Sequence, residues 1–170
     1  MIQDHWRRIS GLHCTEVGRI YAVWIAHNPD DDVTHVYDAC VFPEGVELAV
    51  VAEGFNARGR NIPIAWKNKE LADKLLERGC TMLYEPVSKT DEMAEIISRE
   101  ILERMRTGRF KIEKRLKEWL DEFASFNREE GKVPTDRPFM AATRYAIGEL
   151  QYARSNRSIK KTISRKVAIV

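Results

Sequence analysis

The stretch that decides the fold class runs Ile20-Tyr-Ala-Val-Trp-Ile-Ala26, then Asn28-Pro-Asp-Asp-Asp32, then Val33-Thr-His-Val-Tyr-Asp-Ala-Cys40. Its first and third parts are rich in β-branched and aromatic residues, which are typical of strands. The middle part is made of Asn, Pro and Asp, which are turn residues. Two strands around a short polar turn predict an antiparallel hairpin.

A short strand over 7–13 precedes this hairpin, and elements with helical spacing follow it. The expected order continues with a helix over 46–55 that ends near Gly59, a strand over 62–66, a helix over 71–76 that Gly79 stops, and a strand over 81–84. Next come a helix from a Thr90 cap to Gly108, an extended piece over 109–112, a helix over 116–123, a loop over 129–136 and a helix over 138–154. The helix after Thr90 shows the apolar stripe Met93, Ile96, Ile97, Ile101, Leu102 and Met105. This order predicts an α/β fold in which helices flank a central mixed sheet, as one domain over 1–154 with a basic tail over 155–170.

Composition agrees with a globular protein, because 44% of the 170 residues are hydrophobic and 32% are charged. No apolar run approaches the roughly 20 residues of a membrane span, and the first residues lack a signal-peptide core. We therefore expect no membrane partner and a cytoplasmic location. The cysteines Cys14, Cys40 and Cys80 are scattered, so reduced thiols are expected and no metal site is predicted from them.

Charge is distributed unevenly along the chain. Residues 151–170 hold six basic residues and no acid, so the first 150 hold 22 basic and 26 acidic side chains and carry −4. A basic tail on an acidic body suggests contact with a polyanion, with nucleic acid as the first choice. A solvated terminus without a partner is the alternative.

Several motifs in one order resemble the nuclease domain of terminase large subunits from tailed phages. They are Ala22-Val-Trp-Ile-Ala-His27, Met105-Arg-Thr-Gly-Arg-Phe-Lys-Ile112, Leu116-Lys-Glu-Trp-Leu-Asp-Glu-Phe123, Glu130-Gly-Lys-Val133 and Ala142-Thr-Arg-Tyr-Ala146. The likeness covers about residues 9–154 and implies a ribonuclease-H-like fold. It also implies a part in viral DNA packaging within the bacterial host cytoplasm. The GxxxxGK[ST] loop of the family's packaging ATPase does not occur in the sequence.

The resemblance implies phosphodiester cleavage with two divalent metals held by carboxylates. The family's first acid, in a G-I-D-x-G motif, falls on His13. The second falls near Lys69, after the strand ending in Trp66. The acid pair that opens the last helix is replaced by Arg137 and Pro138, and Ala141 stands at a further variable place. Positive side chains a few ångströms from a dication oppose its binding, so no metal cofactor is expected.

Four acids near these positions in sequence are the fallback ligands for Mg²⁺ or Mn²⁺, namely Glu16, Asp38, Glu85 and Asp136. His13 is a further candidate, as a general base. Ordinary surface carboxylates and a structural histidine are the alternative readings.

The leading hypothesis is an inactive nuclease of a phage or prophage that acts by binding. The expected DNA-binding residues are Lys67, Lys69, Arg137, Arg144, Arg154, Lys160, Lys161 and Arg165. A packaging partner, such as an intact terminase or the portal, is an alternative to double-stranded DNA. Two rival hypotheses stay open, an active endonuclease with relocated carboxylates and a prophage remnant without a role.

Overall fold

The hairpin predicted between residues 20 and 40 lies at the centre of a five-stranded sheet. β2 (Ile20–Asn28) pairs antiparallel with β3 (Val33–Phe42), and β1 (Arg7–Cys14) pairs antiparallel with the other edge of β2. The computed structural model describes residues 1–156. Every residue of β2 between Ile20 and His27 except Tyr21 is buried, because helices cover both faces of the sheet.

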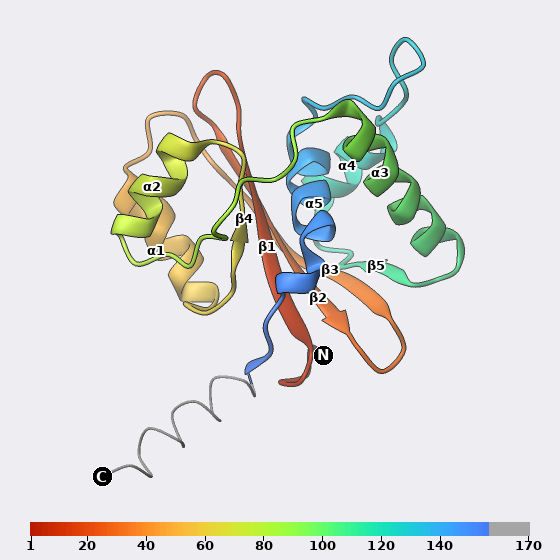
Figure 1. Ribbon diagram of the computed structural model, residues 1–170, viewed down its shortest axis with the longest axis horizontal. Helices are drawn as coiled ribbons and strands as arrows, with labels where there is room; N and C mark the ends of the chain where they lie inside the picture. Colours follow the sequence, from red (N-terminus) through yellow and green to blue (C-terminus); the bar gives the residue numbers. More distant parts are fainter. Residues whose placement is uncertain (157–170) are drawn as a thin grey trace.

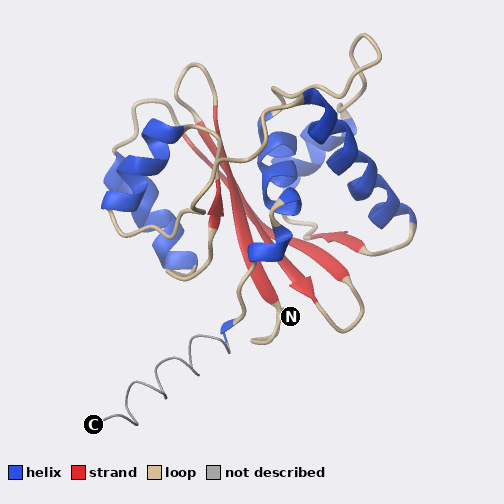
Figure 2. Cartoon of the chain, viewed as in Figure 1, coloured by secondary structure: helices blue, strands red, loops and turns tan. Residues whose placement is uncertain are grey.

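Two short parallel strands complete the sheet at its edges. β4 (Ile64–Ala65) runs parallel to β1, and β5 (Phe110–Ile112) runs parallel to β3, which gives the order β4-β1-β2-β3-β5. The extended piece expected over 109–112 is therefore an edge strand. The predicted mixed sheet is confirmed (Figure 2).

The helices are divided between the two faces of the sheet (Figure 1). They are α1 (Leu48–Arg58), α2 (Lys69–Glu77), α3 (Asp91–Arg106), α4 (Lys117–Ala124) and α5 (Pro138–Gly148). Even-numbered residues of β1 and β2, such as Leu12 and Trp24, pack with α1 and α2. Odd-numbered ones, such as Ile9 and Val23, pack with α4 and α5. The strict alternation of side chains along a strand thus sorts the core into two clusters.

Helix α5 lies against the sheet with almost no space between the two backbones. A Cβ atom added to Gly11 of β1 would lie 1.9 Å from the carbonyl oxygen of Ala142. Only a residue without a side chain fits there, and every residue of α5 from Phe139 to Ile147 is buried. This close approach fixes which side chains of α5 reach the end of β1.

Two expectations about secondary structure were wrong in part. Residues 81–84 form a single bridge, between Met82 and Ile64, and no regular strand. The last helix ends at Gly148, is followed by the short 3₁₀ helix η1 (Leu150–Tyr152), and does not reach Arg154. The reason is that the backbone of Arg154 pairs with Arg8 at the beginning of β1, with N···O distances of 2.8 and 3.0 Å.

The apolar stripe of α3 is only half used by the core. Ile97, Ile101 and Met105 pack against the α4–α5 cluster. Met93, Ile96 and Leu102 are 38%, 48% and 57% exposed. The predicted cap at the beginning of α3 is confirmed, because the hydroxyl of Thr90 accepts a hydrogen bond from the amide of Met93.

None of the helices within residues 1–156 has both the length and the apolar character needed to cross a bilayer.

Candidate functional site

His13 lies one residue before the end of β1, on the face of the sheet that α5 covers. Its Nδ1 atom is 3.1 Å from the hydroxyl of Tyr145 on α5, and the two ring centroids are 5.8 Å apart. Gly11 lies two residues earlier on the same face and lets α5 come close enough to make this contact. The end of β1 and helix α5, which the resemblance pairs in one site, therefore meet in the structure.

The charges around His13 are mostly positive. Burial is the largest cause that lowers the pKa of His13, to about 4, and the nearby cations Lys67 and Arg144 lower it further. Asp136 acts in the opposite direction. The imidazole is therefore neutral at pH 7, and a pKa this far below neutrality makes it a weak general base there.

Lys67, rather than Lys69, is the lysine that faces His13. Lys67 lies two residues after β4 and is half-buried, whereas Lys69 begins α2. The ammonium group of Lys69 is 2.6 Å from Asp73 one turn along, and its side chain is 76% exposed. Sequence alignment placed the second family acid near Lys69, but the structure brings the cation two residues earlier to His13.

Ala141 is fully buried in a small apolar cluster with Ala65, Val87 and Tyr145. The segment that contains Val87 is held against the end of β4 by two hydrogen bonds to Trp66. Trp66 Nε1 donates to the carbonyl of Leu83 at 2.6 Å, and the amide of Val87 donates to the carbonyl of Trp66 at 2.8 Å. Ala141, which corresponds to a variable position in the terminase nucleases, is thus enclosed by apolar side chains.

The N-terminus of α5 is capped from another helix. Arg137 and Pro138 supply no side-chain cap. Instead the carboxylate of Glu122 on α4 accepts hydrogen bonds from the amides of Phe139 and Met140, at 3.2 and 2.6 Å. Burial raises the pKa of Glu122. This carboxylate was missed from the sequence, although a helix that opens on Arg-Pro without a capping side chain signals that its first amides need an outside acceptor.

The four fallback acids do not form a group. Glu16 is exposed in the turn after β1, and Glu85 is exposed in the segment after Met82. Asp38 lies opposite Trp24, on the face of the sheet away from His13, and binds Arg58 with a 2.6 Å ion pair. Asp38 is therefore neither directed toward the site nor free in solvent, which corrects both readings of it. Asp136, although exposed, is the one of the four whose charge acts on His13.

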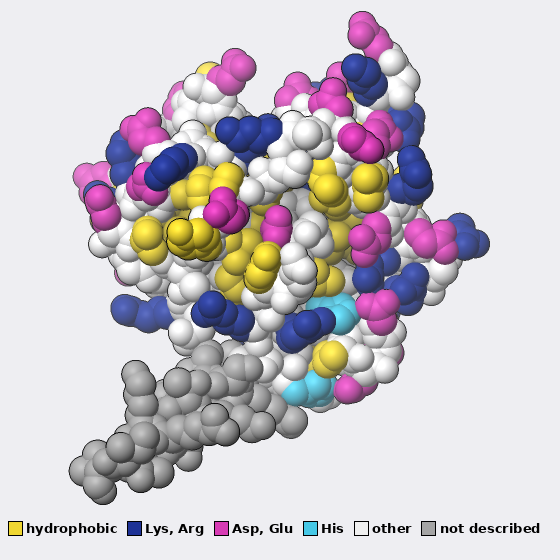
Figure 3. All heavy atoms as spheres, in the orientation of Figure 1, with side chains coloured by type: hydrophobic (Ala, Val, Ile, Leu, Met, Phe, Trp, Pro, Cys, Tyr) yellow, Lys and Arg dark blue, Asp and Glu magenta, His cyan; other side chains and the backbone are white. Residues whose placement is uncertain are grey.

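The expected DNA-binding residues divide into three groups. Lys67, Lys69 and Arg137 lie at the His13 end, where Arg137 forms an ion pair with Glu129. Arg144 is only 4% exposed, so its direct contact with DNA is excluded in this structure. Arg154 is exposed at the opposite end of β1, and Lys160, Lys161 and Arg165 lie outside the described residues. Figure 3 shows basic and acidic side chains interspersed over one face of the described residues.

The residues at the His13 end do not fit a pair of hard divalent metals. Such ions take six or more ligands, mainly carboxylate and carbonyl oxygens. The groups at this end are the neutral imidazole of His13, the ammonium group of Lys67 and the buried methyl group of Ala141. The one carboxylate whose charge acts on His13 is that of Asp136. Within residues 1–156, no group of three or more His, Cys, Asp or Glu side chains is arranged to hold a metal ion.

The depressed pKa of His13 predicts a stability change with pH. Between the unfolded pKa of about 6.5 and the folded pKa of about 4, the unfolded chain binds a proton that the folded chain does not. We expect the free energy of unfolding to fall by about 2 kcal/mol as pH decreases through this window, after a discount for partial exposure. Urea unfolding at pH 7 and pH 4.5 measures the change, and His13→Asn should show less of it. An equal loss in the variant contradicts the assignment to His13.

The chain is similar in sequence and in structure to a phage terminase large subunit. Over 153 residues the chain is 28% identical to the terminase large subunit of Salmonella phage P22. The matched region covers 81% of this chain and 31% of that protein. The structure matches the nuclease domain of the P22 large terminase with a TM-score of 0.78 at 23% identity, over 94% of this chain and 89% of that one. The chain is therefore similar, in sequence and in fold, to the nuclease part of the phage terminase large subunit.

The chain shares its fold with more distant terminase nucleases as well. The nuclease domain of the phage SPP1 large terminase, with bound Mn, matches with a TM-score of 0.63 at 17% identity, over 88% of this chain and 92% of that one. The large terminase nuclease of the thermophilic phage G20c, with bound cobalt, matches with a TM-score of 0.57 at 16% identity, over 85% and 83%. These likenesses confirm the ribonuclease-H-like fold.

No protein-family model matches the chain. The chain spans about a third of the length of the P22 terminase large subunit that it resembles.

Proposed function

We propose that this terminase-like protein acts in phage DNA packaging in the host cytoplasm, by binding DNA without cutting it. The observation that supports this proposal is the set of charges around His13. The cations Lys67 and Arg144 both act on the imidazole of His13, and Asp136 is the one acid whose charge opposes them. A net positive strand end favours a phosphate backbone and disfavours a dication.

The binding surface that we propose includes Lys67, Lys69 and Arg137. Lys69 and Arg137 already pair with Asp73 and Glu129, but all four of these side chains are largely exposed. Exposed pairs of this kind contribute little free energy, so a phosphate group can compete for the cations. The basic residues Lys160, Lys161 and Arg165, which lie outside the described residues, belong to the same proposal as a second contact.

Salt dependence of DNA binding tests the surface quantitatively. Each phosphate contact adds about 0.9 to the slope of log affinity against log salt. We expect Lys67→Gln combined with Lys69→Gln to reduce this slope by about two, measured by fluorescence anisotropy with a labelled duplex. The control is Lys111→Gln with Lys114→Gln, because Lys111 is exposed on β5 at the other edge of the sheet. Slopes that are equal in the two double variants overturn the proposed surface.

Two further outcomes discriminate the competing functions. Salt-insensitive capture of a purified portal or intact terminase, without DNA binding, favours a protein partner instead. Nicking of supercoiled plasmid in Mg²⁺ or Mn²⁺ that Asp136→Ala or Glu16→Ala abolishes favours an active endonuclease. Asp38→Ala serves as the control for the nicking assay, because Asp38 lies on the other face of the sheet.

A further inference from the structure

A cavity of about 230 Å³ lies between α3, α4 and the first half of α5, the three helices that share one side of the sheet in Figure 1. Its wall is mainly apolar and includes Leu102, Met105, Trp119, Phe123, Phe126 and Met140. An engineered cavity of about 150 Å³ binds benzene, and drug-sized ligands take about 300 Å³ or more. This space therefore suits a ligand with one ring or a fused pair of rings.

Arg144 lines the same cavity and is the exception to its apolar character. The residue is 4% exposed, and its Nη1 atom is buried without a hydrogen-bond partner among the residues that the structure describes. Its guanidinium carbon lies 5.9 Å from the ring centre of Phe126, a cation–π contact that gives Nη1 no hydrogen-bond acceptor. Burial lowers the pKa of Arg144. A buried cation without a bonded anion is costly, so this group is suited to receive one.

The nearby carboxylates do not bond to Arg144. Glu122 and Asp136 attract it electrostatically. The oxygens of Glu122 accept the first amides of α5, and Asp136 is exposed. The hydroxyl of Thr143, also in the cavity wall, is engaged by Trp119 Nε1 at 2.9 Å and by the carbonyl of Phe139 at 2.7 Å. Nη1 of Arg144 is thus a buried donor in the described part of the cavity wall that has no hydrogen-bond acceptor.

We propose that this cavity binds a small organic carboxylate with an aromatic or compact apolar body. The body fills the space between α3 and α4, and the carboxylate pairs with the guanidinium of Arg144. Arg99, which also lines the cavity, adds positive charge to the same site. The site does not depend on the proposed DNA binding, because it lies among α3, α4 and α5 and needs neither Lys67 nor Lys69.

Two probes with the same body separate charge recognition from apolar filling. Indole-3-propionate carries the carboxylate, and indole-3-propionamide replaces it with a neutral amide. Titration of the full ¹⁵N-labelled chain is followed by amide chemical shifts. We expect shifts confined to α3, α4 and α5, and about tenfold tighter binding of the acid, because a hydrogen bond to a charged group is worth about that factor. Equal affinity of acid and amide, binding of neither, or shifts elsewhere overturns the proposal.

Variants of Arg144 provide the second test. Arg144→Met should abolish the preference for the acid while the thermal midpoint stays equal or rises, because an unpaired buried charge is removed. Arg106→Gln is the matched control, since Arg106 is an exposed arginine of α3 that pairs with Glu103 outside the cavity. If Arg144→Met does not fold, Arg144→Gln takes its place. Retention of the preference in the Arg144 variant contradicts the assigned role.

Discussion

Gly11→Ala should lower the free energy of unfolding by about 4 kcal/mol or more, which is a large part of the total stability of a domain of this size. The added Cβ would lie 1.9 Å from the carbonyl oxygen of Ala142 and 2.8 Å from its carbonyl carbon. Both are backbone atoms of a helix whose own residues are buried, so the helix has to move away from the sheet as a unit. Circular dichroism during urea unfolding measures the loss.

Gly148→Ala is the matched control for this prediction. Gly148 ends α5, and an added Cβ there would meet the Cδ1 atom of Ile97 at 2.6 Å, which is the tip of a flexible side chain. That methyl group can rotate, and alanine gains about 1 kcal/mol of helix propensity over glycine. We expect a change of less than about 1 kcal/mol from the two opposing effects. If Gly11→Ala is as mild as Gly148→Ala, the close approach of β1 and α5 is wrong.

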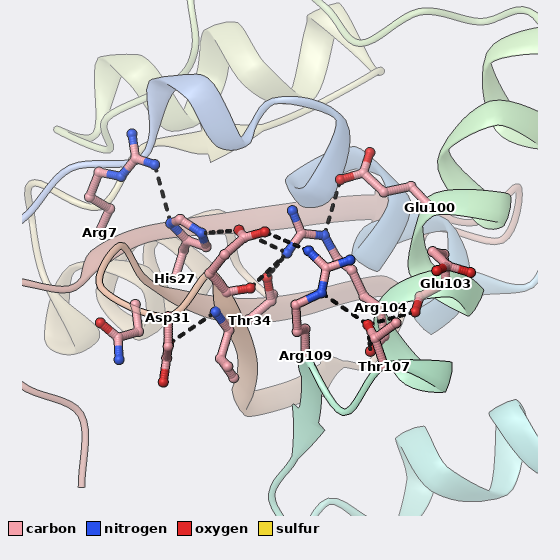
Figure 4. Close-up of polar contacts among 12 residues, drawn as sticks. Arg7, His27, Asp31, Thr34, Glu100, Glu103, Arg104, Thr107 and Arg109 are labelled. Atoms are coloured by element: carbon pink, nitrogen blue, oxygen red, sulfur yellow. Dashed lines mark hydrogen bonds and ion pairs between the residues drawn. The ribbon is translucent and has the colours of Figure 1, made fainter.

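Asp32→Asn should cost about 2–3 kcal/mol, because it removes the one carboxylate that three cationic or donor side chains share. Figure 4 shows His27, Arg104 and Arg109 converging at the β2–β3 turn. Asp32 accepts from His27 Nε2 at 2.8 Å, from Arg104 Nη1 at 3.1 Å and from Arg109 Nη1 at 2.7 Å. Arg7 can only donate to His27 Nδ1, at 3.2 Å, so Nε2 carries the proton that Asp32 receives.

Asparagine is the appropriate substitution because Asp32 has a φ of +55°, which Asp and Asn tolerate better than other side chains. The variant therefore isolates charge from backbone strain. Arg104 is buried and would keep only Glu100 as a carboxylate partner. Asp73→Asn is the control, since it breaks an exposed pair with Lys69 and should change stability by less than about 0.5 kcal/mol. Equal effects of the two variants would contradict the prediction.

The same network predicts the acid limit of stability. The hydrogen bond from His27, followed by those from Arg104 and Arg109, lowers the pKa of Asp32 to about 2 from an ordinary value near 3.8. A depressed carboxyl pKa stabilises the folded state above pH 3.8, and that stability is lost as pH falls toward 2. The loss lies below the window assigned to His13. Asp32→Asn should therefore flatten the unfolding curve below pH 3.8 and leave the His13 step unchanged.

The motif over 105–112 shows what the resemblance could and could not reveal. Its residues identified the chain as terminase-like, but the structure gives Arg109 the role of holding the hairpin turn through Asp32. Arg104, immediately before the motif, shares this role across 72 positions of sequence. No local pattern predicts such a pair, because it depends on α3 and the hairpin meeting in space.

The candidate site was predicted in its position and only partly in its composition. Strand and helix patterns placed His13 at a strand end and Arg137 before the last helix, and both positions are confirmed. Lys67 in place of Lys69, the burial of Ala141 under Val87 and the capping by Glu122 were not predicted. Each depends on how an irregular segment or a neighbouring helix packs, for which periodicity carries no signal.

The exchange of family acids for His13, Arg137 and Pro138 is implied by the resemblance and stays a prediction, whereas the sequence by itself determined the hairpin over 20–40 and the order of helices and strands. These follow from local propensity, residue spacing and residue identity, which need no third dimension. Only the tertiary structure decided that Asp38 faces away from His13, that Arg144 is buried beside a cavity, and that half of the α3 stripe remains exposed. The physical reason is that the packing of helices and strands decides which side chains are buried and which are paired. At the His13 end of the sheet, the close approach of α5 to Gly11 sets this packing.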